Sequence, residues 1–110
     1  MITDLIGHAD YLQILLTLRR RKRLRFSQIQ SQVKLNPTQV SRALKYLRNG
    51  LWILPRSVPT KGDRIFVEYE LGKRGELLLD EVVDSLRDAV RKNVAVFGVA
   101  ELRDVMSLYK

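Results

Sequence analysis

The stretch that decides the fold runs from residue 36 to residue 50 and reads NPTQVSRALKYLRNG. Asn36 is a favoured helix N-cap, and Pro37 occupies the first helical position, where a missing N–H has no consequence. Gln39 follows Asn36 by three residues, which is the spacing of a capping box. We therefore predict a helix that begins at Pro37 and ends at Asn49-Gly50, because glycine accepts the left-handed geometry of a helix stop.

The helix predicted from Pro37 has a narrow apolar face and a broad polar one. Leu35 and Val40 are spaced as a hydrophobic staple across its first turn. Because the polar residues at the start of the helix lie off its apolar face, they are placed to contact a partner. The apolar face comprises Val40, Ala43, Leu44 and Leu47, and the residues that project elsewhere are Thr38, Gln39, Ser41, Arg42, Lys45, Tyr46 and Arg48.

Two further helices are predicted before this one. Apolar residues recur close to helical spacing over Ala9–Arg21, and the basic end of this segment suits the negative pole of a helix dipole. Phe26 begins the next unit, in which Ser27 is a good N-cap for a short helix. Ile29 and Val33 then lie one turn apart and form the inner face of that helix.

A β-hairpin is predicted after the helix that ends at Gly50. Leu51–Val58 and Arg64–Leu71 have the composition of strands, and the second alternates apolar and polar residues. The segment between them, Pro59–Asp63, contains turn-forming residues and Lys61. The hairpin is therefore expected to have a basic tip.

A helical C-terminal region is predicted after the hairpin. Lys73–Lys92 fits a long amphipathic helix, Val94–Ala100 fits either a strand or a helix, and Glu101–Tyr109 fits a short final helix. These segments carry more apolar surface than a small domain can easily hide. We therefore expect residues 1–75 to form one domain and residues 76–110 to form an extension through which two chains assemble as a homodimer.

The charge of the chain is concentrated in its middle. The formal net charge is +8 and the sequence pI is about 10.2. Between Arg19 and Arg64 there are 13 Lys and Arg residues against one acid, Asp63, so this stretch carries +12. The remainder holds seven basic and eleven acidic residues and carries −4. A concentrated positive field favours a polyanionic partner, with nucleic acid first and an anionic membrane surface second.

The composition disfavours several classes of function. The chain has no cysteine, so disulfides and thiolate metal sites are excluded, which fits a reducing cytoplasm. His8 is the single histidine, so a metal site or a catalytic dyad built on it is not expected. Glu76, Glu81 and Asp84 fit the solvent-exposed face of an amphipathic helix better than an acid–base pair. No apolar run approaches the roughly 20 residues that span a bilayer, and no signal peptide is recognisable. We expect neither an enzyme nor a cofactor.

The predicted order of helix, helix, capped helix, hairpin and helix resembles the winged helix-turn-helix superfamily. Phe26–Ile29 and Leu35–Leu47 are similar to the helix-turn-helix of MarR-, ArsR- and HxlR-type regulators, and Tyr69–Gly75 is similar to the end of their wing. The resemblance covers roughly residues 9–84 and implies an α+β, mainly helical winged-helix fold. It also implies that the third helix enters the major groove of duplex DNA, while the hairpin touches the adjacent minor groove or the backbone.

The resemblance implies a set of DNA-binding residues by position. Gln39 is placed to read adenine and Arg42 to read guanine, each through two hydrogen bonds. Lys61 and Arg64 would meet phosphates or a narrow minor groove, and the basic run Arg19–Arg25 would add phosphate attraction if it faces the duplex. The complete expected set is Ser27, Thr38, Gln39, Ser41, Arg42, Lys45, Tyr46, Lys61 and Arg64.

Three residues of this region have structural roles that compete with contact to DNA. Ser27 is expected first as a helix cap, although a capped helix N-terminus also binds phosphate. Tyr46 and Trp52 have rings that can stack on bases, yet partial burial near the hairpin is the favoured expectation.

The function expected from the resemblance is sequence-specific binding of double-stranded DNA by a transcription regulator located in the cytoplasm, at the nucleoid. Two alternatives stay open: a weakly selective architectural or chromosomal DNA-binding protein, and a winged-helix adaptor that docks other proteins. The +12 charge argues against the adaptor, because protein-interaction cores are depleted of charge. RNA binding also stays open, but A-form RNA would not admit the third helix into its major groove.

Overall fold

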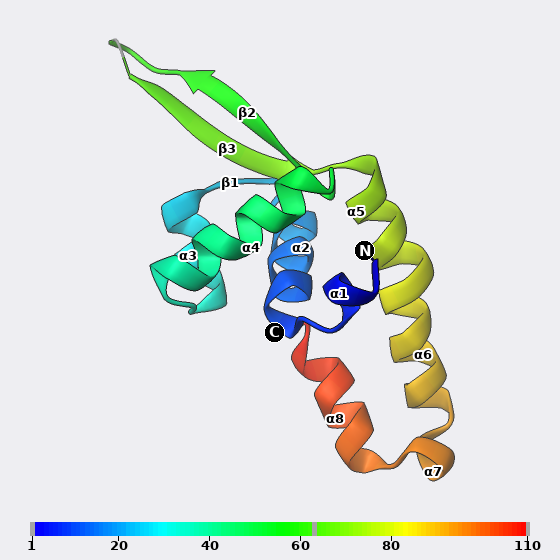
Figure 1. Cartoon of the computed structure of the whole chain (residues 1–110). Coiled ribbons are helices and arrows are strands. Elements are labelled where there is room, and N and C mark those ends of the chain that lie inside the picture. Colours follow the sequence, from blue (N-terminus) through cyan, green and yellow to red (C-terminus); the bar gives the residue numbers. More distant parts are fainter. Residues whose placement is uncertain (1, 63, 110) are drawn as a thin grey trace.

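The computed structural model describes residues 2–62 and 64–109. A small antiparallel sheet with the strand order β1-β3-β2 lies at one end of a group of helices (Figure 1). The predicted α+β, mainly helical class is confirmed, as is the helix over Ala9–Arg21. The elements are α1 (Ile2–Ile6), α2 (Ala9–Arg21), β1 (Arg23–Arg25), α3 (Phe26–Val33), α4 (Pro37–Asn49), β2 (Ile53–Pro59), β3 (Ile65–Leu71), α5 (Lys73–Leu78), a π-helical segment η1 (Leu79–Val83), α6 (Asp84–Lys92), α7 (Val94–Phe97) and α8 (Val99–Ser107).

The start of α4 is fixed by the predicted capping box. The backbone N–H of Gln39 donates to Oδ1 of Asn36 at 2.8 Å, and the backbone N–H of Asn36 donates to Oε1 of Gln39 at 3.1 Å. Both groups would otherwise lack a partner at the first turn of the helix. The predicted apolar face is confirmed, because the buried residues of α4 are Val40, Ala43, Leu44 and Leu47.

The role predicted for Gly50 at the end of α4 is wrong. Gly50 has a φ of −85°, and the residue with a positive φ is Leu51, at 61°. Gly50 provides space instead, because a Cβ at this position would lie 2.6 Å from Nε1 of Trp52. Trp52 itself is only 5% exposed, so it is buried more deeply than the partial burial expected from the sequence.

The basic run after α2 contains a strand that the sequence analysis missed. Lys22 interrupts the helical conformation with a φ of 72°. The three residues of β1 then pair antiparallel with β3, with Arg23 opposite Glu70. A strand of three residues has too short an alternation to be recognised from sequence.

The predicted N-cap of α3 is also wrong. The helix begins at Phe26 and its N-cap is Arg25, so Ser27 lies within the first turn. The side chain of Gln28 performs the capping interaction, because its Oε1 accepts the backbone N–H of Arg25 at 2.9 Å. The sheet determines this start, since Arg25 is still the last residue of β1.

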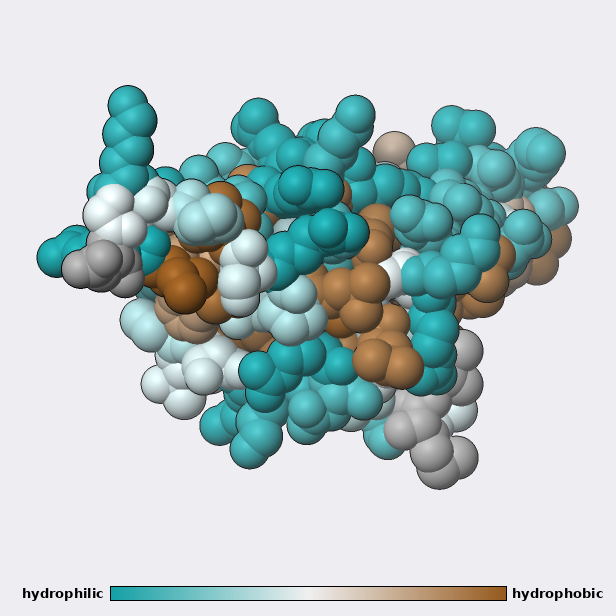
Figure 2. Space-filling model, turned by 90° about the horizontal axis from the view of Figure 1, so that it is seen from above, coloured by the Kyte–Doolittle hydropathy of each residue, from teal (hydrophilic) through white to brown (hydrophobic). Residues whose placement is uncertain are grey.

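The predicted hairpin is formed by β2 and β3, which extend away from the helices (Figure 1). Their register places Ile53 opposite Leu71 at the base and Pro59 opposite Ile65 at the far end. Seen from above, hydrophobic side chains gather at the far end of the hairpin and in the middle of the molecule, between hydrophilic ones (Figure 2). The hairpin therefore exposes apolar as well as basic residues.

The turn of the hairpin is closed by one residue pair. The backbone N–H and the hydroxyl of Thr60 both donate to the carbonyl oxygen of Arg64, at 3.3 Å and 2.6 Å. Gly62 has a φ of 119°, which favours glycine at this position. Asp63, part of the predicted turn, lies outside the described residues.

The predicted helix over Lys73–Lys92 is continuous but contains the π-helical segment η1 between α5 and α6. Only part of its expected apolar stripe is buried: Val82 is 39% and Leu86 is 47% exposed. The ambiguous segment after it is helical, because α7 and α8 follow. Figure 1 shows α8 returning toward α1 and α2, and α8 contacts α6.

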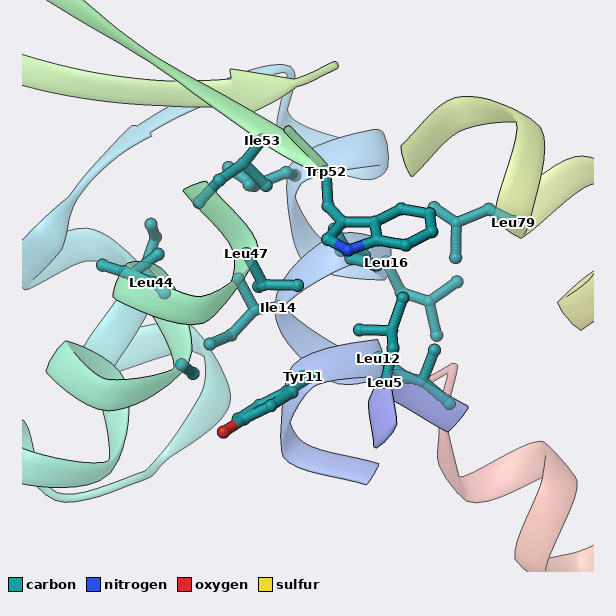
Figure 3. Close-up of a cluster of buried hydrophobic side chains, with 14 of the residues drawn as sticks. Leu5, Tyr11, Leu12, Ile14, Leu16, Leu44, Leu47, Trp52, Ile53 and Leu79 are labelled. Atoms are coloured by element: carbon teal, nitrogen blue, oxygen red, sulfur yellow. The ribbon is translucent and has the colours of Figure 1, made fainter. Parts of the chain in front are cut away.

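The core is built around α2, whose buried apolar residues share one cluster with residues of α3, α4, β2 and η1. Figure 3 shows the ring of Trp52 between Leu16 of α2 and Leu79 of η1, with Leu47 of α4 on the opposite side of α2. The radius of gyration is 15.3 Å, compared with about 13 Å for a compact chain of this length. The difference arises because the hairpin and the C-terminal helices project from this core.

Gly75 allows α5 to approach the start of the hairpin, and Gly75→Ala is expected to destabilise the fold by about 1–2 kcal/mol. A Cβ on Gly75 would overlap the carbonyl oxygen of Trp52, which belongs to the rigid backbone. Alanine in a helix usually stabilises relative to glycine, so the expected sign is reversed. Chemical denaturation measures the change.

Gly7→Ala is the matched control for this substitution. A Cβ on Gly7 would lie 3.5 Å from the carbonyl oxygen of Thr3, which is an ordinary contact. We expect unchanged or slightly higher stability, since alanine restricts the unfolded chain. Equal stability of the Gly75 variant and wild type would contradict the close approach.

Candidate nucleic-acid interface

One face of α4 is free of the core and carries four of the predicted site residues. Thr38, Ser41, Arg42 and Lys45 are all exposed, and their spacing places them along one side of the helix. Together with Phe26 and Pro37 they line a shallow hollow. The structure therefore brings these predicted residues together on the side opposite the buried face of α4.

The cations of this face have no ion-pair partner in the part of the chain that the structure describes. In residues 2–62 and 64–109, no carboxylate oxygen lies within 4.0 Å of the charged nitrogens of Arg42, Lys45 or Arg48. All three side chains are exposed. The face therefore presents positive charge and hydrogen-bond donors to solvent.

Gln39 has a structural role that limits its freedom to contact a ligand. Its Oε1 accepts the backbone N–H of Asn36 in the capping box. Two-pronged recognition of adenine needs the same oxygen as an acceptor, together with the side-chain NH₂ group as a donor. Such contact would compete with the cap, whereas Arg42 has no comparable restraint in the described structure.

Tyr46 lies on the flank of α4 that faces α2 and is half-buried, as expected. Its ring stacks on that of Tyr11, with centroids 5.0 Å apart and planes inclined by 30°. Tyr11 in turn stacks on His8, with centroids 4.6 Å apart. These contacts give the ring of Tyr46 a packing role between α4 and α2.

The remaining predicted site residues lie elsewhere. Ser27 is exposed and borders a separate hollow with Arg21 and Gln28, between the end of α2 and α3. Lys61 and Arg64 are exposed at the end of the hairpin. The structure thus has three groups of predicted residues, on α4, at the start of α3 and at the end of the hairpin.

The basic run Arg19–Arg25 does not act as a single patch, because some of its charges are paired. Arg19 binds carboxylates of the C-terminal helices, and Nε of Arg23 donates to Oε2 of Glu70 at 3.1 Å. Arg56 of β2 also donates to Glu70, and this hydrogen bond lowers the pKa of Glu70. The +12 charge of the sequence therefore overstates the free positive charge of this region.

Asp84 does not lie on a solvent-exposed helix face as predicted. It is part of a half-buried ionic cluster. Nη1 and Nη2 of Arg19 donate to its two oxygens at 2.9 Å and 3.2 Å, and the hydroxyl of Tyr109 donates to Oδ1 at 2.7 Å. Burial acts to raise the pKa of Asp84, but these hydrogen bonds outweigh it and the pKa is lowered. The cluster joins α2, α6 and the C-terminus.

Sequence reasoning missed three residues beside the exposed face of α4. Phe26, Tyr69 and Arg48 line a second hollow that also contains Ser41 and Lys45. Arg48 was placed off the apolar face but was not included in the expected site; it follows Ser41 by seven residues and Lys45 by three, so helical spacing could have added it. The positions of Phe26 and Tyr69 depend on the pairing of β1 with β3, for which the sequence gives no clear signal.

These elements define the class of the protein. A core helix, a helix-turn-helix and a β-hairpin that follows its second helix constitute a winged helix-turn-helix fold. The hairpin of β2 and β3 is the wing, and α4 occupies the position of the recognition helix. The resemblance stated from the sequence is thereby confirmed at the level of the fold.

Comparison with known proteins agrees with this fold. The structure is similar to RV1404 from Mycobacterium tuberculosis, with a TM-score of 0.65, 17% sequence identity, and coverage of 90% of this chain and 66% of that one. It is also similar to a MarR family transcriptional regulator from Silicibacter pomeroyi, with a TM-score of 0.61, 15% identity, and coverage of 88% and 63%. The chain thus spans slightly less than two thirds of either protein. No family model and no curated protein matches the sequence.

In residues 2–62 and 64–109, no three His, Cys, Asp or Glu side chains gather as a metal site would require. No helix of the same residues combines the length and apolar character needed to cross a membrane.

Proposed function

We propose that the protein binds double-stranded DNA and acts as a transcription regulator without catalysing a reaction. The observation that carries this proposal is the exposed face of α4, on which Arg42, Lys45 and Arg48 project with no carboxylate partner in the described chain. An α-helix fits the roughly 12 Å wide major groove, where such donors reach base edges and phosphates. The winged-helix fold supports this use of α4.

Recognition would combine base contacts from α4 with phosphate contacts from its surroundings. Arg42 is suited to guanine, because its guanidinium can donate two parallel hydrogen bonds to the acceptors of that base. Thr38, Ser41 and Lys45 would contact bases or phosphates from the same face, and Gln39 would act only at the expense of its capping bond. Ser27, Lys61 and Arg64 would bind the backbone on either side.

Fluorescence anisotropy on a pool of duplex DNA, with a salt titration and sequence selection, tests the proposal. We expect the logarithm of affinity to fall linearly with the logarithm of salt concentration, with a slope of about −0.9 for each phosphate neutralised. Enrichment of a two-fold symmetric sequence supports a dimeric, sequence-specific regulator. Tight binding without an enriched sequence would favour the architectural alternative, and absence of binding at low salt would contradict DNA binding altogether.

We further infer that the C-terminal region forms a homodimer interface. Although α6 and α8 contact each other, the C-terminal region leaves large apolar side chains exposed, including Val96 of α7 at 82% and Val99 of α8 at 62%. A two-fold dimer would bury these residues and place two α4 helices on successive turns of DNA. The other exposed apolar residues of this region are Leu77, Val82, Leu86, Phe97 and Met106.

Sedimentation of the full chain tests the dimer. We expect a dimer at micromolar concentration and a shift toward monomer in Leu86→Glu, because a charge at the centre of an apolar interface is desolvated without a partner. Glu101→Gln, an exposed polar change on α8, serves as the control. A wild-type monomer at micromolar concentration would contradict the inference.

A further inference from the structure

The outer half of the wing carries an apolar surface that nothing in the described chain covers. Ile65 is 67% exposed and Val67 is 43% exposed, while Pro59 is also exposed. In the register of the hairpin Pro59 lies directly opposite Ile65. Directly opposed residues of an antiparallel pair lie on the same face, so Pro59, Ile65 and Val67 form one continuous apolar surface.

The base of the same sheet face is part of the core. Ile53 and Leu24 are buried, and Leu24 pairs with Tyr69, which lies two positions beyond Val67 on β3. The apolar residues of this sheet face are thus buried at the base of the hairpin and exposed to solvent at its far end. Solvent exposure of apolar residues at the end of a projecting hairpin gives no stability to the single chain, which points to contact with a partner.

The apolar end of the wing continues the exposed face of α4. Tyr69 lines the hollow that also contains Ser41 and Lys45 of α4. Ile65 lies four residues farther along β3, or about 13 Å for an extended strand. This length is comparable to the roughly 12 Å width of the major groove. If α4 lies in the major groove, the end of the wing therefore lies at the adjoining phosphate backbone and minor groove.

The charges next to this surface match a nucleic acid. Lys61 and Arg64 lie between Pro59 and Ile65 in the turn, and both are exposed. On the opposite face of the hairpin the guanidinium of Arg25 lies 4.8 Å from the centroid of the Phe66 ring. Cations therefore flank the apolar end, as expected for a wedge that must pass between two phosphate backbones.

We propose that Pro59 and Ile65 form an apolar wedge that enters the minor groove, unstacks a base step and bends the duplex. This inference rests on the proposed DNA-binding function and deepens it. Apolar wedges of proline and isoleucine type lower the cost of a kink because they replace the lost stacking with apolar contact. Lys61 and Arg64 would hold the phosphates on either side of the opened step.

The test uses the full chain and a mixed-sequence duplex of about 30 base pairs that carries a donor and an acceptor dye at its ends. Anisotropy measures binding, and energy transfer between the dyes measures bending. We expect wild type to raise the energy transfer at saturation. Ile65→Ser should bind DNA about fivefold more weakly, because the burial of the isoleucine side chain is lost, although the variant no longer has to unstack a base step. It should produce no rise in energy transfer.

Ile6→Ser is the matched control, because Ile6 is 47% exposed and lies in α1, at the end of α2 remote from the sheet (Figure 1). It should bind and bend DNA as wild type does. Circular dichroism checks that both variants fold. Binding by wild type without a rise in transfer, or an unchanged rise in Ile65→Ser, would overturn the wedge while leaving DNA binding intact. Absence of any binding by wild type would overturn both proposals.

Discussion

Arg42→Ala is expected to weaken binding to a preferred DNA site by about 10- to 100-fold, with a much smaller loss on random duplex. A two-pronged contact to guanine discriminates against other bases by about 1–3 kcal/mol, whereas a phosphate contact does not depend on sequence. Arg42 is exposed in the second turn of α4, and no carboxylate of the described residues competes for it. Anisotropy on a selected site and on random DNA measures both affinities.

Two variants serve as controls for Arg42→Ala. Lys61→Ala should weaken both DNAs alike and make the salt slope less steep by about one phosphate, because Lys61 is expected to meet the backbone. Arg103→Ala removes an exposed arginine of α8, and it should leave both affinities unchanged. Equal losses on both DNAs in Arg42→Ala would contradict base reading by α4.

Asp84→Ala is expected to destabilise the protein by about 2–3 kcal/mol. The substitution leaves the guanidinium of Arg19 and the hydroxyl of Tyr109 without their shared acceptor. Loss of one partner of a buried pair usually costs about 3–5 kcal/mol, and the value is reduced here because the side chains of Arg19 and Asp84 are 31% and 27% exposed. Chemical denaturation measures the loss.

Asp88→Ala on the same helix is the matched control for Asp84→Ala. Asp88 pairs with Arg87 at 3.2 Å and with Arg91 at 3.4 Å, and its own side chain is 39% exposed. We expect a change within about 0.5 kcal/mol, as for most surface ion pairs. A similar loss in both variants would show that the cluster around Asp84 is no stronger than a surface pair.

The cluster also predicts how stability depends on pH. The pKa of Asp84 is lowered in the folded state, so its contribution is present above the ordinary carboxyl pKa and is lost as pH falls through the folded value. Burial and the hydrogen bond to Asp84 raise the pKa of Tyr109 to about 12, so its contribution is present below the ordinary pKa of 10.0 and is lost as pH rises toward 12. The difference in the free energy of unfolding between wild type and Asp84→Ala should therefore become smaller at both low and high pH.

The helix α4 is the element that sequence reasoning predicted best. Its start depends on contacts within a few residues, namely the reciprocal hydrogen bonds of Asn36 and Gln39 and the fixed φ of Pro37. Its buried face follows from helical periodicity alone. Local interactions of this kind are encoded by neighbouring residues, so they can be identified without the tertiary fold.

Errors arose where residues distant in sequence decide the outcome. β1 exists because its three residues pair with β3, and that pairing also placed the N-cap of α3 at Arg25 instead of the predicted Ser27. Gly50 is required by the indole of Trp52 rather than by its own φ. Periodicity and capping rules contain no information on such contacts.

The candidate site was predicted in part for the same reason. Spacing on one helix grouped Thr38, Ser41, Arg42 and Lys45, whereas Phe26 and Tyr69 reach their hollows through sheet pairing. Charge counting predicted a basic middle of the chain, but it did not predict which cations would be neutralised. Arg19 is separated from Asp84 by 65 residues.

The sequence by itself therefore determined the fold class, the bounds of α4 and the polarity of its two faces, because these depend on short-range hydrogen bonds and on the helical repeat. Only the tertiary structure decided which charges remain free, where the apolar end of the wing lies relative to α4, and how the C-terminus is anchored. Those features depend on contacts between segments that are distant along the chain, and no periodic pattern in the sequence indicates such contacts. Coulombic and packing interactions act through space, and the fold determines which partners they join.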